Sequence, residues 1–177
     1  MVMLILIVVS ILGVGAAQIA LMSERSARND RDMQIAWQSA EAALMDAQVD
    51  IFTTRASIFD GTNDHFAVSG CGTSGDELGF CTLKTTGKPA WLTVDFTDTS
   101  SSAQTIEFGH FTSRQFASAG VGIQPAKAPR YVIELMLDPG RPDPSKIKYI
   151  YRVTAMGFGP RPHIQAVLQA LYRPHPN

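Results

Sequence analysis

The chain has 177 residues and a formal net charge of -1 at pH 7, and 18% of its residues are charged. A near-neutral chain has no electrostatic footprint for nucleic acid, so we expect no nucleic-acid partner. Globular proteins usually contain about a quarter charged residues, and the deficit here comes largely from one apolar segment at the start. About 125 residues follow the helix that this segment begins, which leaves room for one small domain and not two.

Residues 1–52 are predicted to form one continuous helix, about 78 Å long, because no proline interrupts them. The first part, 1–22, contains no charged residue, and only Ser10 and Gln18 are polar. About 20 apolar residues suffice to cross the hydrocarbon core of a bilayer. The segment is longer than the apolar core of a secretory signal peptide and lacks its small-residue cleavage site. We therefore predict a transmembrane half of the helix at 1–22.

The second part of the helix, 23–52, has an amphipathic pattern. Apolar residues recur there at alternating steps of four and three, which predicts a helical stripe that packs on a soluble domain. The predicted packing residues are Met33, Trp37, Ala40, Leu44, Ala47 and Ile51.

Residues 53–129 form a variable region rich in Gly, Ser, Thr and Pro, with short strands expected at 66–68, 80–83, 91–96 and 105–108. Cys71 and Cys81 lie in this region with nine residues between them. A membrane anchor makes an exported domain the expectation, and in an oxidising compartment this pair forms a disulfide worth about 2 to 3 kcal/mol. The alternative is two unrelated free thiols.

Residues 130–177 predict a C-terminal antiparallel β-meander. Strand-length runs of β-branched and aromatic residues occur at 130–137, 147–155 and 163–172, joined by Pro- and Gly-rich segments. Apolar and polar residues alternate in the last two runs, which predicts a sheet with one side buried. The only apolar surface of matching size is the stripe on 23–52. We therefore expect an α+β fold in which the sheet lies across the second half of the long helix.

A search for catalytic chemistry is mostly negative. The four histidines are scattered, and none has metal-ligand spacing with a cysteine or carboxylate. No nucleophile elbow or phosphate-binding loop occurs, so we expect neither an enzyme nor a cofactor. Asp60 to Asp64 cluster oxygen ligands without the spacing of a calcium loop, and Asp138 and Asp143 bracket a hairpin loop. We interpret both as turns, with a bound divalent ion as the less favoured alternative.

The stretch 13–48 resembles the N-terminal region of the PilX-type minor pilins of type IV pili. That pattern is an apolar helix, an acidic-basic pair and a Gln-x-Ala-Glu-Ala-x-Leu segment. It is matched here by Glu24, Arg25, Asn29, Asp32, Ala36, Gln38, Ala40, Glu41, Ala42 and Leu44. Residues 151–172 are similar to the closing hairpin of the same family, whereas 53–130 align with nothing.

The resemblance implies a type IV pilin-like fold and a structural role. A prepilin peptidase would cut the precursor, the new N-terminus would be methylated, and the helix would leave the inner membrane to pack in a fibre. The partners implied are other minor pilins and the major pilin. The folded domain that follows the apolar half of the helix, which we call the head, is expected in the periplasm of a Gram-negative bacterium. After assembly it is expected on an extracellular pilus used in adhesion and twitching motility. Contacts in membrane or fibre are expected from Leu4, Val8, Ile11, Gly13, Gly15 and Ile19.

One departure from the major pilins concerns acidic residues. Major pilins carry a glutamate early in the mature helix, and no acidic residue precedes Glu24 here. Either Met1 lies a little beyond the cleavage site, or the subunit does not need that carboxylate, which would suit a subunit at the pilus tip that helps to start assembly. The alternatives are a pseudopilin of a type II secretion system, a membrane-anchored periplasmic binding or sensor domain, and an anchored enzyme. By the positive-inside rule, the arginines that follow the apolar run would instead put the domain after the helix in the cytoplasm.

Overall fold

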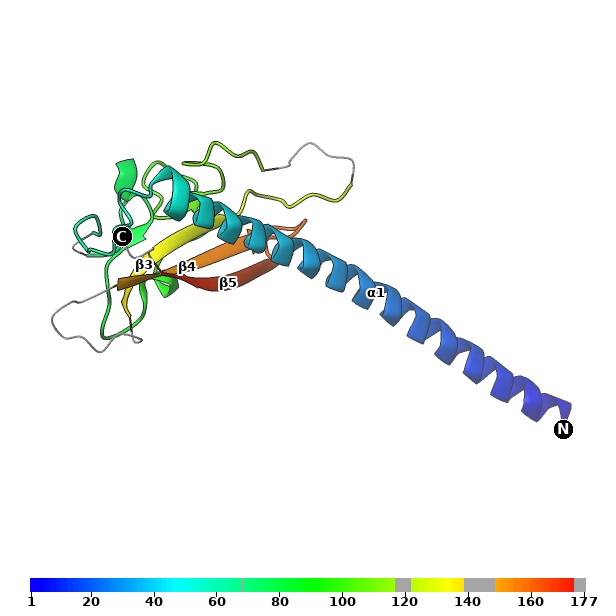
Figure 1. Ribbon diagram of the computed structural model, residues 1–177. Coiled ribbons are helices and arrows are strands. Elements are labelled where there is room, and N and C mark those ends of the chain that lie inside the picture. Colours follow the sequence, from blue (N-terminus) through cyan, green and yellow to red (C-terminus); the bar gives the residue numbers. More distant parts are fainter. Residues whose placement is uncertain (68, 117–121, 139–148, 174–177) are drawn as a thin grey trace.

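The computed structural model describes residues 1–67, 69–116, 122–138 and 149–173. Helix α1 (Val2–Val49) continues into a π-helical turn (η1, Asp50–Thr54), and its first half projects away from the rest of the chain (Figure 1). None of residues 2–22 is buried by any other described part of the chain, and this helix is long and apolar enough to cross a membrane. The helix runs unbroken past Glu24, where the composition changes from apolar to mixed.

The second half of α1 lies on a mainly antiparallel sheet. Its strands are β1 (Phe80–Cys81), β2 (Ile106–Glu107), β3 (Arg130–Leu137), β4 (Tyr149–Phe158) and β5 (Gln165–Tyr172). The order is β1-β3-β4-β5, with β2 also paired to β3; among these five strands the β1–β3 pairing is parallel and the others are antiparallel. The helix crosses mainly β4 and β5, as Figure 1 shows. This is the expected α+β, type IV pilin-like arrangement of a long helix on an antiparallel sheet.

The face of α1 that contacts the sheet consists mostly of alanines. Gly157 of β4 lies so close to the helix that an added Cβ would stand 2.2 Å from both the Ala36 carbonyl oxygen and the Ala40 amide nitrogen. Small residues on both sides permit this close approach, and larger side chains at the contact would push helix and sheet apart. The buried apolar residues of this face are Ala36, Ala40, Ala43, Ala47 and Ile51.

The predicted packing stripe was therefore wrong at its start. Met33 and Trp37 are 49% and 50% exposed and lie outside the contact with the sheet. Leu44 is partly buried at the edge of the core, whereas Ala40, Ala47 and Ile51 lie within the contact. The physical reason is that the close approach at Gly157 favours the alanine face, and the larger side chains of Met33 and Trp37 are turned to solvent.

Strand β3 is buried on both faces, whereas β5 has the one-sided burial that the sequence predicted, with Ala166 buried and Val167 and Leu171 exposed. Successive residues of a strand point to opposite faces. Tyr131, Ile133 and Leu135 of β3 join the core beside α1, and Val132 packs in a second cluster on the other face. That second cluster is completed by Cys71, Cys81, Ala90 and Phe96. The variable region therefore supplies 8 of the 23 buried apolar residues of the described chain.

Cys71 and Cys81 form a disulfide, as predicted. Around it, the variable region contains less regular strand than expected. β1 and β2 are two residues each, residues 90–92 form a 3-10 turn (η3, Ala90–Leu92), and a second 3-10 turn covers Gly75–Glu77 (η2). Val68, in the strand expected at 66–68, lies outside the described residues.

Candidate functional site

The apolar half of α1 holds most of the large exposed apolar side chains among the described residues. The predicted contact residues all lie on it, and the large ones are between 46% and 71% exposed. An added Cβ at Gly13 or Gly15 would meet no other atom within 4 Å. These residues are Leu4, Val8, Ile11, Gly13, Gly15 and Ile19. Such a surface needs a bilayer or other helices around it, because exposed apolar area costs about 25 cal/mol per Å² in water.

Four exposed apolar side chains, which we call the outer stripe, lie on the C-terminal half of α1 outside its contact with the sheet. They are Met33, Trp37, Met45 and Val49, which are 36% to 56% exposed. Met33 and Trp37 lie on one side of the helix, and Met45 and Val49 lie about 120° further round it, because each residue turns the helix by about 100°. The Trp37 indole donates a 3.0 Å hydrogen bond to Glu41 on the same helix. The sequence pattern had shown Met33 and Trp37, but it assigned them to the core.

Three carboxylates on the buried face of α1 tie the helix to the head. Asp32 accepts a 3.0 Å hydrogen bond from Arg161, in the turn between β4 and β5. Arg31 also binds Asp32, and these contacts lower the pKa of Asp32: the Arg31 hydrogen bond contributes most, while burial opposes it. This contact anchors the helix at the level where its exposed half begins.

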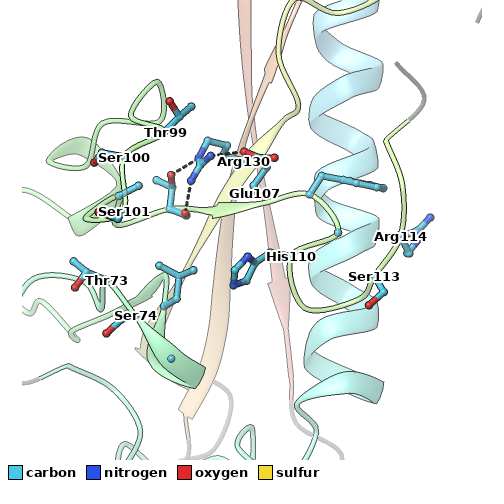
Figure 2. A pocket seen from close by; sticks show the side chains of 16 residues that line it. Thr73, Ser74, Thr99, Ser100, Ser101, Glu107, His110, Ser113, Arg114 and Arg130 are labelled. Carbon is cyan, nitrogen blue, oxygen red and sulfur yellow. Dashed lines mark hydrogen bonds and ion pairs between the residues drawn. The ribbon is translucent and has the colours of Figure 1, made fainter. Parts of the chain in front are cut away.

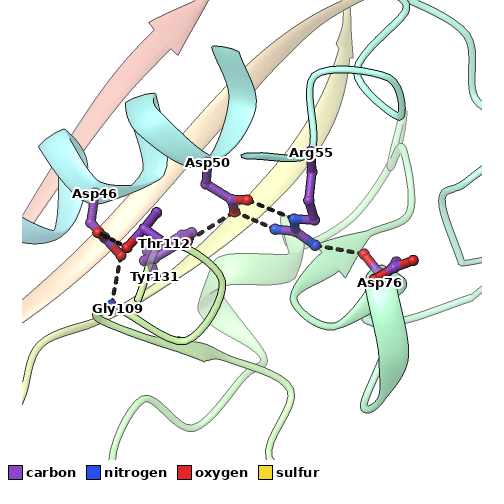
Figure 3. A network of polar contacts seen from close by, with 7 residues as sticks. All are labelled: Asp46, Asp50, Arg55, Asp76, Gly109, Thr112 and Tyr131. Atoms are coloured by element: carbon purple, nitrogen blue, oxygen red, sulfur yellow. Dashed lines mark hydrogen bonds and ion pairs between the residues drawn. The ribbon is translucent and has the colours of Figure 1, made fainter. Parts of the chain in front are cut away.

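Asp46 and Asp50 make the other two ties (Figure 3). Asp46 accepts hydrogen bonds from the Gly109 amide at 2.8 Å and the Thr112 hydroxyl at 2.5 Å. Asp50 binds Arg55 and accepts a 2.9 Å hydrogen bond from the Tyr131 hydroxyl. Burial, then the nearby carboxylates, raise the pKa of Tyr131 well above its ordinary value, so its hydroxyl remains a donor. Both carboxylates therefore hold loops of the variable region against the helix.

Sequence reasoning named Asp32 only as part of the PilX-type pattern and missed Asp46 and Asp50. A signal was present, because Asp32, Asp46 and Asp50 lie in phase with the buried alanines Ala36 and Ala43 at helical spacing. An acidic residue on the packed face of a helix requires a buried partner. Apart from Tyr131 of β3, the partners of Asp46 and Asp50 come from loops that the sequence pattern did not place.

A pocket of about 570 Å³ opens beside β2, on the head. It is lined by residues 73–78, 99–105 and 107–114, with Arg130 of β3 (Figure 2). The sequence had indicated no site there. Its walls come from two separate segments of the variable region, 73–78 and 99–114, and from Arg130 of β3.

Neither of the two divalent-ion alternatives is supported by a ligand cluster in the described part of the chain. The Asp60 carboxylate accepts hydrogen bonds from the amide and hydroxyl of Thr62, both at 2.8 Å, which closes a turn. The loop between Asp138 and Asp143 falls mostly in 139–148, outside the described residues.

Comparison with known proteins gives two matches to family models. Residues 1–44 match the model described as PilX N-terminal, and residues 77–174, more than half of the chain, match the model described as type IV pilus assembly protein PilX C-term. No curated protein and no solved structure matches the chain. The second match covers the sheet and also reaches Cys81 and most of the pocket lining, in the stretch 53–130 that the resemblance in the sequence had left unaligned. The chain therefore belongs to the PilX family of type IV pilus assembly proteins.

Proposed function

We propose that this chain is a minor pilin that helps to start type IV pilus assembly, at the tip of the fibre and together with other minor pilins. The observation that carries the proposal is the fully exposed apolar half of α1, rigidly continuous with a helix that is packed in the head. Such a subunit is stable with its helix in a bilayer or among the helices of neighbouring subunits, because both environments cover the apolar surface.

Two features of the helix support a structural role in a fibre. Its exposed half has small residues at Gly13 and Gly15, which allow close approach of a neighbouring helix. The outer stripe extends the exposed apolar surface down to the head, where Trp37 offers a large contact for a neighbouring subunit. The major pilin and the other minor pilins are the partners that this surface would fit.

A place at the tip is supported by the absence of acidic residues from 1–23. A carboxylate in the apolar core of a fibre needs a partner, because burying an unpaired one costs several kcal/mol. A subunit at the tip lacks a neighbour on one side, so no neighbouring group is there to pair with such a carboxylate. A starting complex is also needed once per fibre, whereas elongation draws on the major subunit.

The same proposal assigns the location of the protein. Before assembly, the helix spans the inner membrane with the head on the periplasmic side, after a prepilin peptidase has cut the precursor. The Cys71–Cys81 disulfide supports an oxidising compartment for the head. After assembly, the head is exposed on the extracellular pilus.

The proposal is tested by deleting the gene and counting surface fibres and their lengths by electron microscopy. We expect fewer fibres of unchanged length, restored by the wild-type chain supplied in trans. Gold labels on a tagged, complementing copy should lie at fibre ends. Labels spread evenly along a normal number of fibres would show an ordinary shaft subunit. A secretion defect with normal fibres would indicate a pseudopilin instead.

A further inference from the structure

The pocket beside β2 is held in shape by bonds between its walls. Asp46 of α1 fixes the turn at Gly109 and Thr112, and the Gln104 side chain donates a 3.2 Å hydrogen bond to the Cys71 carbonyl of the disulfide loop. Its volume of about 570 Å³ lies within the range of small-molecule sites, roughly 300 to 1,000 Å³. The walls are therefore organised without a ligand, which lowers the entropy lost on binding.

Hydroxyl groups dominate the rim of this pocket. Figure 2 shows most of them on two loops, with Ser113 on a third loop beside Arg114 and the His110 imidazole between Arg114 and the first two loops. All of these hydroxyl residues are exposed: Thr73, Ser74, Thr99, Ser100, Ser101 and Ser113. Leu78 and Phe108 add a partly buried apolar surface. Alcohol side chains both donate and accept hydrogen bonds, so the rim suits a ligand that does the same.

Arg130 and Glu107 form a fixed donor and acceptor pair in the pocket. Arg130 donates to the Thr105 hydroxyl at 2.7 Å, to the Thr105 carbonyl at 2.8 Å and to Glu107 Oε2 at 2.7 Å. These bonds use three of the five N–H groups of a guanidinium. The Glu107 side chain is 51% exposed, which leaves its carboxylate accessible from the pocket, while that of Arg130 is only 9% exposed.

The charges in the pocket are balanced. Glu107 neutralises Arg130, and Asp46 lies 3.6 Å from the Arg114 guanidinium. A phosphate or carboxylate would meet the Glu107 charge, and a cation would meet the Arg130 charge, so neither class of ion is favoured. A neutral molecule with many hydroxyl groups can accept from Arg130 and donate to Glu107 at once.

We propose that this pocket binds a neutral saccharide of one or two rings. Its hydroxyls accept from Arg130 and donate to Glu107, the exposed serines and threonines bind the remaining hydroxyls, and the apolar face of a ring rests on Phe108 and Leu78. The proposal concerns the head alone and does not depend on where the subunit sits in the fibre.

Saturation-transfer difference NMR on the full chain tests this, in a detergent without a sugar head group. The probes are lactose, maltose and N-acetylchitobiose, with sialyllactose and inorganic phosphate as anions. We expect saturable binding of at least one neutral disaccharide. Binding of N-acetylchitobiose alone would indicate a cell-wall sugar, and binding of lactose or maltose a hexose glycan. No saturable signal at about 10 mM, ten times a Kd of about 1 mM, would overturn the proposal. Displacement of the sugar by phosphate would indicate an anion site and would also overturn it.

Two substitutions locate the sugar. Glu107→Gln removes the charged acceptor and should weaken binding of the neutral sugar about tenfold. Ser101→Ala removes one rim hydroxyl and should weaken it about threefold. Glu41→Gln, at an exposed carboxylate on α1, is the matched control and should leave the affinity unchanged.

Melting curves establish that each variant is folded. If Glu107→Gln does not fold, Ser101→Ala decides alone, because its side chain is exposed. Unchanged affinity in every folded pocket variant would place the sugar elsewhere and overturn the proposal.

Discussion

Arg55 folds back onto Asp50, five residues earlier, and its guanidinium binds both oxygens of the Asp50 carboxylate. The two side chains are 4% and 0% exposed. The same guanidinium donates to the Asp76 carbonyl at 2.5 Å and lies 3.6 Å from the centre of the Phe111 ring. This pair joins the end of the long helix to the disulfide loop, so the helix and the variable region are one folded unit.

Arg55→Met should destabilise the head strongly, because it leaves the Asp50 charge buried without its main partner. The expected loss is about 3 to 5 kcal/mol in the free energy of unfolding. Arg28→Met is the matched control, since Arg28 pairs with Glu24 on the surface, where the side chains are 65% and 57% exposed. It should change stability by less than about 1 kcal/mol. Chemical denaturation of both variants in detergent measures the difference, and equal losses would contradict the structure.

Gly157→Ala should separate the helix from the sheet. The added methyl group would overlap the backbone of Ala36 and Ala40, which cannot move as a side-chain end can. We expect a loss of about 3 kcal/mol or more, at the upper end of overpacking effects. Gly13→Ala, where nothing lies within 4 Å, is the control and should leave the melting temperature of the head unchanged. A tolerated Gly157→Ala would mean that the helix does not approach β4 this closely.

Trp37→Ala should affect assembly without affecting folding. Because the side chain is half exposed, truncation should change the free energy of unfolding by no more than about 0.5 kcal/mol. Leu44→Ala, at the edge of the core, should cost about 1 to 3 kcal/mol. In a deletion strain, the Trp37 variant should restore fewer fibres than the wild-type chain. Normal fibre numbers would show that the outer stripe makes no contact needed for assembly.

Protonation of Asp32 in acid should lower the stability of the folded protein. Its pKa is lowered in the folded state, so the unfolded chain binds a proton more readily, and the stability that Asp32 contributes is present above its unfolded pKa. That contribution is lost as the pH falls through the folded pKa, within a window of about pH 5 to pH 2. Asp32→Asn should therefore flatten the fall in melting temperature across this window.

Arg161→Met provides the matching change in the partner of Asp32. It should flatten the pH dependence less than Asp32→Asn, because the Arg31 hydrogen bond is the largest cause of the lowered pKa. An identical pH profile in wild type and Asp32→Asn would show that the contact at the start of the packed half of the helix does not form.

The sequence by itself determined the elements whose signals are local. An unbroken apolar run without proline predicts the exposed half of α1, and alternating β-branched and aromatic residues predict β3, β4 and β5. The disulfide followed from two cysteines in one short loop. These properties depend on neighbours along the chain, so periodicity and composition are enough to find them.

The tertiary structure alone decided which face of the helix packs and what the variable region does. Periodicity identifies an apolar stripe on the helix, but it does not show whether that stripe or a face of alanines packs better on the sheet. The close approach of the helix to Gly157 favoured Ala36 and Ala40 over Trp37. The pocket unites Thr73, Ser101, Glu107 and Arg130 from separate segments. Contacts between such distant residues depend on how the loops cross the sheet, and no local pattern in the sequence encodes those crossings.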